Sequence, residues 1–374
     1  MPNGANANDL RHMRHALRLA QRALGTTAPN PAVGCIIVGR DGHIVGRGWT
    51  QPGGRPHAET LALAQAGARA RAATAYVTLE PCAHQGVTPP CANALAEAGI
   101  VRVVAATTDP DPRVSGAGFA HLEKQGIAVT RGPCEGEARA LNAGFFRRIT
   151  ESRPLVALKI AASADGYIAD ANGNSRWITS PESRRHSHLL RAQYDAIMVG
   201  IGTVLADDPA LTCRLPGLES RSPVRFVLDS RLQLPEDSKL VQTAGDVPVI
   251  VFTLARSGGE PLTTRGVTIE RMRETENGLP ALASVLNALA QRGITRLLVE
   301  GGPRVHASFL KSGLADLLHL FRAAMLLGAA GKPAIGAAWQ ADLASAPRLR
   351  LLDTMHLGPD LLETFAFAER AGTR

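Results

Sequence analysis

Three potential zinc ligands in the first third of the chain constrain most strongly how it can fold. His57, Cys82 and Cys91 lie in separate segments, so a fold that uses them together must bring these segments to one point. Three protein ligands are typical of a catalytic zinc site, which leaves its fourth position for water. Glu59 is a carboxylate outside this ligand set, two residues after His57 and close enough to carry a proton. The pattern therefore predicts a catalytic Zn2+ site. Zinc at such a site lowers the pKa of bound water and makes hydroxide available at pH 7.

The order of these residues, H-x-E followed by P-C and a second C, is the signature of zinc-dependent nucleobase deaminases. One spacing differs, because eight residues separate Cys82 from Cys91 where the signature has two. Thr88-Pro89-Pro90 in this stretch is expected to be stiff and non-helical. Cys91 then begins a predicted helix, whose N-terminus would lower the pKa of the thiol. The simpler alternative is that His57 is an ordinary polar residue and that the cysteines are buried and inert.

The chain of 374 residues is longer than one typical hydrophobic core and predicts two domains, 1–150 and 151–374. Its five cysteines are too few for a disulfide framework. No stretch has the character of a secretory signal or a membrane span, so we expect a cytoplasmic protein without a membrane partner.

The net charge of +8 is dispersed and fits phosphate-bearing small molecules as well as nucleic acid. An aromatic content of 4% argues against a base-stacking platform.

Alternating strand and helix patterns in residues 1–150 indicate an α/β sandwich with a mixed sheet. Asp9 is expected to cap the first helix, and Asp41-Gly42 to form the turn of a hairpin. The expected helices are 10–24, 59–70, 92–98 and 118–125, and the expected strands are 33–38, 44–49, 74–79, 100–107 and 127–130.

Residues 151–374 repeat the alternation and predict a second α/β domain with its own core. Gly200-Ile201-Gly202-Thr203 and Glu300-Gly301-Gly302 both follow a predicted strand and precede a helix. Backbone N–H groups at such a helix start can bind phosphate, and a packing glycine in a tight turn is the alternative for each. Neither turn matches the G-x-G-x-x-G fingerprint. The expected strands are 155–162, 196–199, 224–228, 247–252, 294–299 and 317–323, and the expected helices are 181–193, 279–291 and 303–311.

Several motifs together resemble one family, the bifunctional riboflavin-biosynthesis deaminase/reductases. In the first half they are Pro29-Asn30-Pro31-Ala32-Val33-Gly34, His57-Ala58-Glu59, Leu79-Glu80-Pro81-Cys82 and Thr88-Pro89-Pro90-Cys91. In the second half they are Trp177-Ile178-Thr179-Ser180, Gly202-Thr203-Val204-Leu205-Ala206-Asp207-Asp208-Pro209 and Val299-Glu300-Gly301-Gly302. The resemblance implies a cytidine-deaminase-like α/β/α sandwich with a mixed sheet, followed by a dihydrofolate-reductase-like α/β domain.

The resemblance also implies two consecutive reactions. A zinc-dependent hydrolase in the first domain would deaminate 2,5-diamino-6-(5-phosphoribosylamino)pyrimidin-4(3H)-one to 5-amino-6-(5-phosphoribosylamino)uracil. Glu59 would take a proton from water and deliver protons to the ring nitrogen and the departing amine. An oxidoreductase in the second domain would use NADPH to reduce the ribosyl group to ribityl. The implied partner is the small phosphoribosyl pyrimidine and not nucleic acid, and we expect a homo-oligomer.

By resemblance, specific residues would line the two sites. Lys159 would lie near the ribose carbon that is reduced and act as a catalytic residue. Substrate would contact Asn30, His84 and Asp109 in the first domain and Ser175, Arg191, Leu211, Arg214 and Glu300 in the second, where the two arginines could grip the phosphate. NADPH would contact Ala161, Trp177, Thr203, Asp207, Ser230, Gly302, Pro303, Arg304, Val305, His306, Ala307 and Ser308.

Some of these assignments have a plainer alternative. Lys159 could be an edge residue that reaches water, the arginines could be solvated surface residues, Trp177 could be core and His84 a packed loop residue. Three positions depart from the family pattern. Val87 replaces a Lys or Arg that would meet the substrate phosphate, Asp111 replaces an Asn, and Met325 replaces a Lys.

Two other functions compete with this assignment. A nucleoside or nucleic-acid deaminase with an accessory C-terminal domain would usually have two residues between its cysteines. A non-catalytic module with structural zinc would normally supply four protein ligands, and the sequence offers three.

Overall fold

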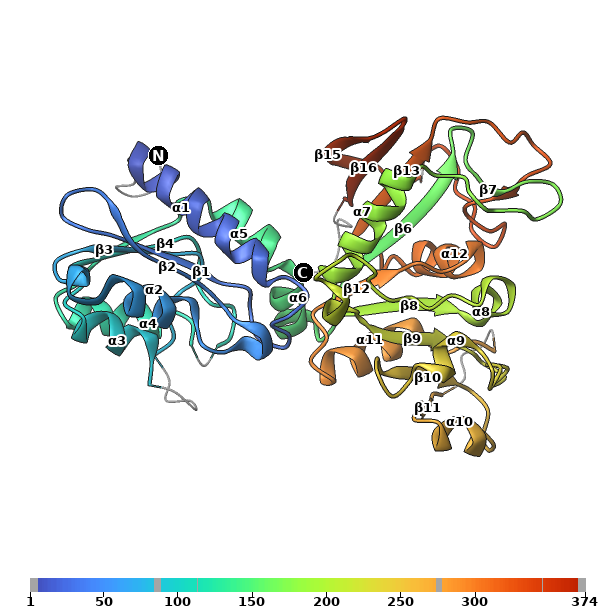
Figure 1. Ribbon diagram of the computed structural model, residues 1–374, viewed down its shortest axis with the longest axis horizontal. Helices are drawn as coiled ribbons and strands as arrows, with labels where there is room; N and C mark the ends of the chain where they lie inside the picture. The colour runs from blue at the N-terminus through green and yellow to red at the C-terminus, as the bar shows by residue number, and fades with distance from the viewer. Residues whose placement is uncertain (1–5, 84–88, 113, 274–277, 345, 369–374) are drawn as a thin grey trace. The chain divides into compact units, whose positions relative to one another are not determined.

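The computed structural model describes residues 6–83, 89–112, 114–273, 278–344 and 346–368. The chain divides into two compact units, Met1–Ser152 and Arg153–Arg374 (Figure 1). Each unit has its own main sheet and its own hydrophobic core. None of the helices in the described residues is long and apolar enough to cross a membrane.

The first unit is built around one five-stranded mixed sheet. Its strands are β1 (Gly34–Val38), β2 (Ile44–Trp49), β3 (Thr74–Val77), β4 (Arg102–Ala105) and β5 (Ala128–Arg131). They pair in the order β2-β1-β3-β4-β5, antiparallel from β2 to β3 and parallel from β3 to β5. The helices are α1 (Ala7–Ala20), α2 (Ala58–Ala66), α3 (Cys91–Glu97), α4 (Ala117–Lys124), α5 (Glu135–Leu141) and α6 (Ala143–Glu151).

Helices cover both faces of this sheet. Successive residues of a strand point to opposite faces, so one strand can contribute to an apolar cluster on each face. On β1, Ile36 belongs to the apolar cluster that contains Met13 of α1. Cys35 and Ile37 belong to the cluster on the other face, which contains Ala62 of α2. The predicted α/β sandwich with a mixed sheet is therefore confirmed.

The first helix begins earlier than its sequence pattern indicates. Asn6 is the N-cap: Asp9 N–H donates to Asn6 Oδ1 and Asn6 N–H donates to Asp9 Oδ2, each at 3.0 Å. The prediction that Asp9 caps the helix is wrong, because Asp9 completes this reciprocal capping box from inside the first turn. Asp9 is also buried, where it accepts two hydrogen bonds of 2.9 Å from the Arg102 guanidinium.

Two glycines of β2 allow α2 to approach the sheet at backbone distance. A Cβ atom at Gly48 would lie 2.0 Å from the Ala58 carbonyl oxygen, and one at Gly46 would meet the same helix at 2.1 Å. Neither position has room for a side chain. Because His57 is the N-cap of α2 and Glu59 lies in its first turn, this close contact sets the position of both residues.

The second unit contains a nine-stranded sheet and a small two-stranded one. The strands of the large sheet are β6 (Leu155–Ser163), β8 (Ala196–Gly200), β9 (Val224–Leu228), β10 (Val249–Thr253), β11 (Thr268–Arg271), β12 (Arg296–Val299), β13 (Leu317–Ala323), β15 (Leu349–Leu357) and β16 (Asp360–Phe367). Their order is β11-β10-β9-β8-β12-β6-β13-β16-β15, parallel from β11 to β13 and antiparallel from there to β15. The small sheet pairs β7 (Tyr167–Ala169) with β14 (Lys332–Pro333).

Helices pack on both faces of the large sheet, which confirms the predicted α/β class. They are α7 (Pro181–Ala192), α8 (Ile201–Asp207), α9 (Lys239–Gln242), α10 (Glu260–Thr264), α11 (Leu282–Gln291) and α12 (Pro303–Ser312). Leu286 of α11 and Phe309 of α12 lie in one apolar cluster with Phe226 of β9. Leu240 of α9 lies in the cluster on the other face with Val227.

We predict that Gly48→Ala destabilises the first unit and weakens its binding of zinc. The added methyl group would meet backbone atoms of α2, so the helix must shift and carry His57 and Glu59 with it. Overpacking of this kind costs roughly 1–3 kcal/mol. Chemical denaturation measures the loss of stability, and competition with a chromogenic chelator measures the zinc affinity.

Gly136→Ala is the matched control for this substitution. Gly136 lies in α5, and nothing lies within 4 Å of the position that its new Cβ would occupy. Alanine is favoured over glycine in a helix by about 1 kcal/mol, so this variant should be at least as stable as the wild type. A Gly48→Ala variant with wild-type stability and zinc affinity would contradict the role given to the contact between α2 and β2.

Candidate active sites

The three predicted zinc ligands lie together in the first unit. His57 Nδ1, Cys82 Sγ and Cys91 Sγ are all within 4.8 Å of one another. His57 Nδ1 is 3.3 Å from Cys91 Sγ and 3.8 Å from Cys82 Sγ. Ligand atoms that surround a tetrahedral zinc ion at roughly 2.0–2.3 Å lie roughly 3.5 Å from one another, so these three atoms fit the ion. An imidazole nitrogen and two sulfurs are also ligands that zinc prefers.

Two helix starts and one strand end supply these ligands. His57 is the N-cap of α2, Cys91 is the first residue of α3, and Cys82 follows β3. Cys91 N–H donates a hydrogen bond of 3.3 Å to Cys82 Sγ. The pKa of Cys82 is lowered to about 4, first by the hydrogen bond with the Cys91 side chain and further by His57, against the opposing effect of burial. Cys82 is therefore set up as a thiolate ligand.

Glu59 lies beside the ligands in a protected position. It is in the first turn of α2, and only 4% of its surface is exposed. Burial raises the pKa of its carboxyl group, and the positive charge of His57 acts in the opposite direction. A carboxyl group with a raised pKa can both accept and return a proton, which is what general acid–base catalysis requires.

Glu80 connects the metal-binding segment to a neighbouring loop. Its buried carboxylate accepts hydrogen bonds from the N–H groups of Asp109 (3.2 Å), Gly116 (3.0 Å) and Gly118 (2.9 Å). Since Cys82 is only two residues from Glu80, these bonds fix the loop after β4 close to the metal ligands. Asp109, which the sequence predicts to bind substrate, is thereby held near the site.

Asn30, another predicted substrate residue, lies in the turn before β1. Its side chain packs against Gly54, where a Cβ atom would lie 2.0 Å from Asn30 Nδ2. Gly54 is three residues before His57, so Asn30 lies beside the segment that leads into the metal site. His84, the third predicted substrate residue of this unit, lies outside the described residues.

Two of the three departures from the family pattern can be placed. Asp111 is buried, and its backbone N–H donates to Asp109 Oδ1 at 2.9 Å. Met325 is partly exposed, and its carbonyl accepts a 2.8 Å hydrogen bond from Ala164 N–H. Both contacts use the backbone, so they do not depend on the side chain present. Val87 lies outside the described residues.

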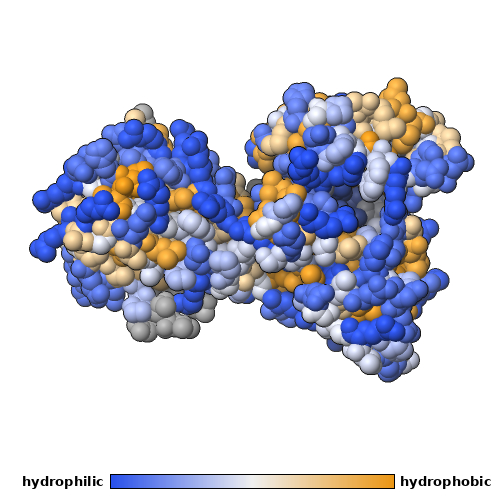
Figure 2. Space-filling view, in the orientation of Figure 1, coloured by the Kyte–Doolittle hydropathy of each residue, from blue (hydrophilic) through white to orange (hydrophobic). Residues whose placement is uncertain are grey.

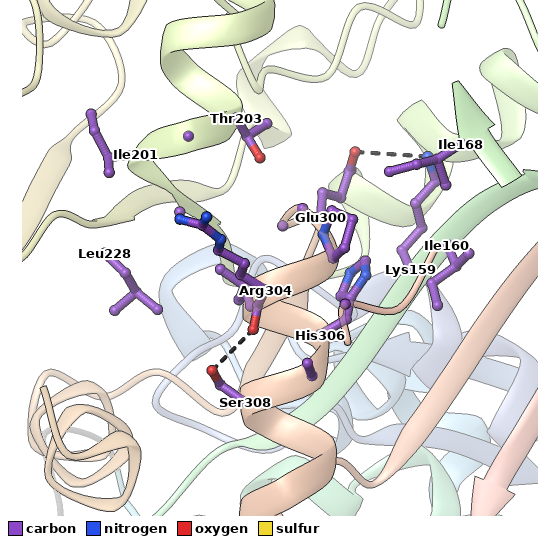
Figure 3. Close-up of a pocket in the computed structure, with 18 of the residues that line it drawn as sticks. Lys159, Ile160, Ile168, Ile201, Thr203, Leu228, Glu300, Arg304, His306 and Ser308 are labelled. Carbon is purple, nitrogen blue, oxygen red and sulfur yellow. Dashed lines mark hydrogen bonds and ion pairs between the residues drawn. The ribbon is translucent and has the colours of Figure 1, made fainter. Parts of the chain in front are cut away.

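The second unit contains a cavity of about 2160 Å³ at the carboxyl ends of its parallel strands. The direction in which the chain adds strands to the sheet reverses here. After β8 the chain adds β9, β10 and β11 towards one edge of the sheet, whereas after β12 it adds β13 on the far side of β6. Such a switch point is the usual ligand site of an open α/β sheet. Pockets for one drug-sized ligand have roughly 300–1,000 Å³, so this cavity has room for a cofactor and a substrate together. Figure 3 shows Lys159 of β6 and His306 of α12 on its wall.

Lys159 of β6 and Glu300, the residue after β12, are neighbours because Leu158 pairs with Val299. Lys159 Nζ lies 3.9 Å from Glu300 Oε2, and both side chains are largely buried. Burial lowers the pKa of Lys159, and Glu300 partly opposes this effect. The alternative that Lys159 reaches water from an edge strand is wrong, since β6 lies inside the sheet between β12 and β13.

Arg191 grips Glu300 with one edge of its guanidinium. Arg191 Nε donates to Glu300 Oε1 at 2.8 Å and Nη2 donates to Oε2 at 2.9 Å, while Nη1 donates to the Thr212 carbonyl at 3.0 Å. Burial would raise the pKa of Glu300, but Arg191 and then Lys159 outweigh it and lower the pKa to about 2. Arg191 is therefore not a solvated surface residue, and its bidentate bond is made to a carboxylate of the protein.

The other predicted substrate residues of this unit differ in exposure. Arg214 is exposed on the cavity wall, with Nη2 at 3.5 Å from His188 Nε2, and Ser175 lines the same cavity. Leu211 does not line it with its side chain, which is 3% exposed and packs in an apolar cluster with Val204. Its contact with substrate stays a prediction.

The predicted cofactor residues line this cavity as well. They are Ala161, Trp177, Thr203, Asp207, Ser230, Gly302, Pro303, Arg304, Val305, His306, Ala307 and Ser308. The helix α12 begins at Pro303, which has no N–H group, and the N–H groups of Val305 and His306 donate to the Gly302 carbonyl. A phosphate at this helix start would therefore be bound by the N–H groups of Gly302 and Arg304, which both line the cavity. Trp177 is 67% exposed, and the Arg184 guanidinium lies 4.5 Å from its ring centroid. The alternative that Trp177 is a core residue is wrong.

Sequence reasoning missed part of the cavity wall. Some lining residues lie in motifs that the sequence analysis singled out, namely Ile178, Thr179, Ile201, Ala206 and Gly301. No motif marked several others. These include Arg184, His188, Leu228, Arg231, Gln233, residues 278–283, Lys311 and Lys332. They come from segments that are distant in the sequence, and only the sheet brings them together.

Two family models match the chain, one in each unit. The model described as the cytidine and deoxycytidylate deaminase zinc-binding region matches residues 6–107. The model described as the RibD C-terminal domain matches residues 154–362, which is more than half of the chain.

Curated relatives and solved structures agree with these matches. The chain is 45% identical to riboflavin biosynthesis protein RibD of Aquifex aeolicus over 86% of its own length and 88% of the relative. It is 42% identical to RibD of Escherichia coli over 94% of the chain and 97% of the relative. A structure of Acinetobacter baumannii RibD matches with a TM-score of 0.87 and 38% identity, over 97% of this chain and 99% of that one. The diaminohydroxyphosphoribosylaminopyrimidine deaminase/5-amino-6-(5-phosphoribosylamino)uracil reductase of Thermotoga maritima matches with a TM-score of 0.87 and 36% identity, over 96% and 99%.

We predict that Glu300→Gln destabilises the second unit by roughly 3–5 kcal/mol at pH 7, because Arg191 and Lys159 remain buried without their counter-charge. The folded-state pKa of about 2 lies below the ordinary value of 4.5. The stability that the carboxylate provides is therefore fully present above pH 4.5 and is lost as the pH falls towards 2. Chemical denaturation between pH 7 and pH 3 should show the difference between wild type and variant shrinking below pH 4.5.

Glu270→Gln is the matched control, because Glu270 pairs with Arg292 on the surface of the same unit. An exposed ion pair contributes less than about 1 kcal/mol, so this variant should stay close to the wild type. Equal losses in the two variants, independent of pH, would show that the buried cluster does not stabilise the fold as described.

Proposed function

This chain belongs to the family of riboflavin biosynthesis protein RibD, and on that premise we propose that each compact unit carries one of the two activities. The protein is a bifunctional enzyme of riboflavin biosynthesis that joins a zinc-dependent deaminase to an NADPH-dependent reductase. In this proposal residues 1–150 form the deaminase domain and residues 151–374 the reductase domain. The observation that carries it is the separation of the His57–Cys82–Cys91 cluster in the first unit from the large cavity in the second.

The first unit has the groups that deamination of 2,5-diamino-6-(5-phosphoribosylamino)pyrimidin-4(3H)-one requires. Zinc, when bound, supplies a Lewis acid that makes water nucleophilic at neutral pH. Glu59 takes the proton of the attacking water and returns protons to the ring nitrogen and the departing amine, which leaves as ammonia. Asn30 and Asp109 offer an amide and a carboxylate to the polar edge of the pyrimidine. Glu80 keeps Asp109 in place through the loop after β4.

The second unit has the groups that reduction of the ribosyl group requires. NADPH, when bound, supplies the hydride. The N–H groups of Gly302 and Arg304 at the start of α12 would hold its phosphates, and Thr203 and Asp207 line the same wall. Lys159 would place its ammonium group near the ribose carbon that is reduced, and Glu300 holds that ammonium in position. Arg191 in turn holds Glu300, so it acts as a positioning residue.

We further propose a cytoplasmic homo-oligomer that pairs through β15 and does not use nucleic acid as substrate. β15 is the outer strand of the large sheet, and its residues Leu349, Leu351, Leu352 and Met355 are each at least 39% exposed. Figure 2 shows hydrophobic surface near the hairpin that Figure 1 labels β15 and β16. An exposed apolar edge strand favours pairing with another chain. Sedimentation velocity of Leu351→Lys against the wild type tests this interface.

We predict that Glu59→Gln and Lys159→Met each remove one activity and spare the other. Glu59→Gln should retain one zinc ion per chain but lose deamination by roughly a hundredfold or more, because general acid–base catalysis contributes about 10²–10⁴. Lys159→Met should lose NADPH oxidation with 5-amino-6-(5-phosphoribosylamino)uracil. Separate assays of ammonia release and NADPH absorbance, with metal analysis, measure these effects.

Glu123→Gln, which alters an exposed carboxylate on α4, is the control for the first unit. Loss of both activities in either variant would contradict the assignment of one activity to each unit. Unchanged deamination by Glu59→Gln would remove Glu59 from the proton path. Turnover of oligonucleotides without turnover of the phosphoribosyl pyrimidine would favour the competing nucleic-acid deaminase.

A further inference from the structure

Part of the wall of the reductase cavity is an irregular segment that leads into α7. Trp177, Ile178 and Thr179 line the cavity but belong to no helix or strand. The helix that follows adds Arg184 and Ser187 to the same wall. Irregular backbone has no ladder of hydrogen bonds of its own, so the position of this segment depends on what holds the start of α7.

A carboxylate from the far end of the chain holds that start. Asp360 is the first residue of β16, and only 2% of its surface is exposed. Its Oδ2 accepts a hydrogen bond of 2.7 Å from Ser180 N–H and another of 2.7 Å from the Ser183 hydroxyl. None of these three residues lines the cavity, so Asp360 supports the wall from behind.

The serine between them joins the helix to the hairpin a second time. Ser180 is the N-cap of α7 and accepts a 3.1 Å bond from Ser183 N–H, while its hydroxyl donates to the Leu357 carbonyl at 2.9 Å. Burial raises the pKa of Asp360, but hydrogen bonds from Ser183 and Ser180 outweigh this effect and lower it. Asp360 is therefore charged at pH 7. Its bonds are strengthened by that charge, which the N-terminal end of the helix dipole also favours.

The residue after Ser183 carries this support to the cavity. Arg184 Nη1 donates a hydrogen bond of 2.6 Å to the Thr179 carbonyl. The guanidinium carbon of Arg184 lies 4.5 Å from the centroid of the Trp177 ring, which is the geometry of a cation–π contact. Fixing the first turn of α7 thus fixes the backbone at Thr179 and the ring of Trp177.

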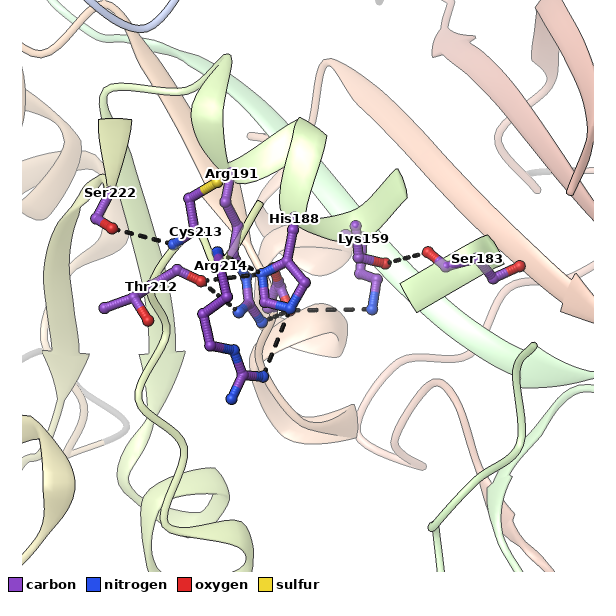
Figure 4. Close-up of polar contacts among 10 residues, drawn as sticks. Lys159, Ser183, His188, Arg191, Thr212, Cys213, Arg214 and Ser222 are labelled. Carbon is purple, nitrogen blue, oxygen red and sulfur yellow. Dashed lines mark hydrogen bonds and ion pairs between the residues drawn. The ribbon is translucent and has the colours of Figure 1, made fainter. Parts of the chain in front are cut away.

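The other end of α7 is held by separate contacts. Ser183 and Arg191 lie at opposite ends of this helix (Figure 4), and Arg191 makes its bidentate bond to Glu300 from the last turn. Two residues after the helix, Tyr194 Oη lies 2.9 Å from His319 Nε2. A change at the first turn should therefore leave Arg191 and its partner Glu300 in place.

We propose that Asp360 is a positioning residue of the reductase, which acts through Ser180 and Ser183 to hold Trp177 and Arg184 in the geometry that receives NADPH. Asp360 does not touch the cofactor, so its effect is on the binding of NADPH and not on hydride transfer. This role rests on the proposed function, because binding of NADPH in this cavity belongs to that function.

Asp360→Asn tests the proposal by steady-state kinetics of the full-length enzyme. Asparagine has the same shape, but it has no charge and turns one acceptor into a donor. The KM for NADPH should rise about tenfold, which corresponds to about 1.4 kcal/mol. The kcat of reduction and the KM for 5-amino-6-(5-phosphoribosylamino)uracil should stay within about twofold, because only binding of the cofactor is weakened. Ammonia release by the first unit should not change.

The mobility of Trp177 gives a second readout. The chain has three tryptophans, so replacing Trp49 and Trp339 by Phe leaves Trp177 as the only emitter. In this background Asp360→Asn should increase the fast component of the decay of fluorescence anisotropy in the free enzyme. An unchanged decay would show that Asp360 does not hold the segment.

Asp195→Asn is the matched control, because Asp195 makes a comparable set of buried bonds. Its Oδ2 accepts from Thr295 N–H at 2.8 Å, from the Thr295 hydroxyl at 2.6 Å and from Arg296 N–H at 2.9 Å. These bonds lie at the start of β12, at the end of the strand away from the cavity, and Asp195 does not line the cavity. Asp195→Asn should lower the free energy of unfolding, as Asp360→Asn does, but leave the KM for NADPH and the anisotropy of Trp177 unchanged.

Ser183→Ala keeps the test decisive if Asp360→Asn does not fold. This variant removes one hydroxyl and leaves both the carboxylate and the cap at Ser180 in place. The KM for NADPH should rise by a smaller factor than in Asp360→Asn. The double variant should show less than the product of the two single effects, because the two residues share one bond.

The outcomes separate this inference from the function on which it rests. A wild-type enzyme that does not oxidise NADPH with the phosphoribosyl pyrimidine contradicts the proposed function itself. An active wild type with an unchanged KM for NADPH in Asp360→Asn and Ser183→Ala overturns only the positioning role. An equal rise in Asp195→Asn would also overturn it, since any loss of stability would then raise the KM. A fall in kcat without a change in KM would place the effect in hydride transfer and contradict the role in binding.

Discussion

Parallel pairing of neighbouring strands is the constraint on which both sites depend. In the first unit β3 and β4 run in parallel, so Glu80 after β3 can bind the backbone of Asp109 after β4. In the second unit β6 and β12 run in parallel, so Lys159 and Glu300 become neighbours. Parallel strands expose their carboxyl ends at one edge of the sheet, and the helices that follow begin there. Chemical groups that are distant in the sequence thus meet without long loops.

The same side-chain type serves opposite purposes in the two units. Glu59 is buried with few compensating charges, and its pKa is raised, which suits a group that must exchange protons. Glu300 is buried between Arg191 and Lys159, and its pKa is lowered to about 2, which suits a fixed negative charge. Two groups of the same type can take different acid–base roles when their surroundings shift their pKa values apart. In our proposal the first unit uses Glu59 to move protons, whereas the second unit uses Glu300 to hold a cation.

Local patterns in the sequence were sufficient for the zinc ligands and for most central strands, because both leave a signal in neighbouring residues. The bounds of β6 and β13, for example, agree with their apolar runs to within one residue. The cap of α1 was misassigned, since Asn6 and Asp9 are both good N-cap residues and they bond to each other in a capping box whose cap is Asn6. The hairpin β15–β16 was not identified from the sequence. The partner of Arg191 and the proximity of His188 to Arg214 depend on how segments pack, which no local pattern records.

The central claim is that one chain carries out deamination and reduction in succession, and product analysis by mass spectrometry tests it most directly. The purified enzyme, loaded with zinc, is incubated with 2,5-diamino-6-(5-phosphoribosylamino)pyrimidin-4(3H)-one, first alone and then with NADPH deuterated at the transferred position. The account predicts that the substrate alone exchanges one amino group for oxygen and that the deuterated cofactor then adds one deuterium and one proton to that product. An unchanged substrate, or a product that gains deuterium while it keeps both amino groups, would contradict the account.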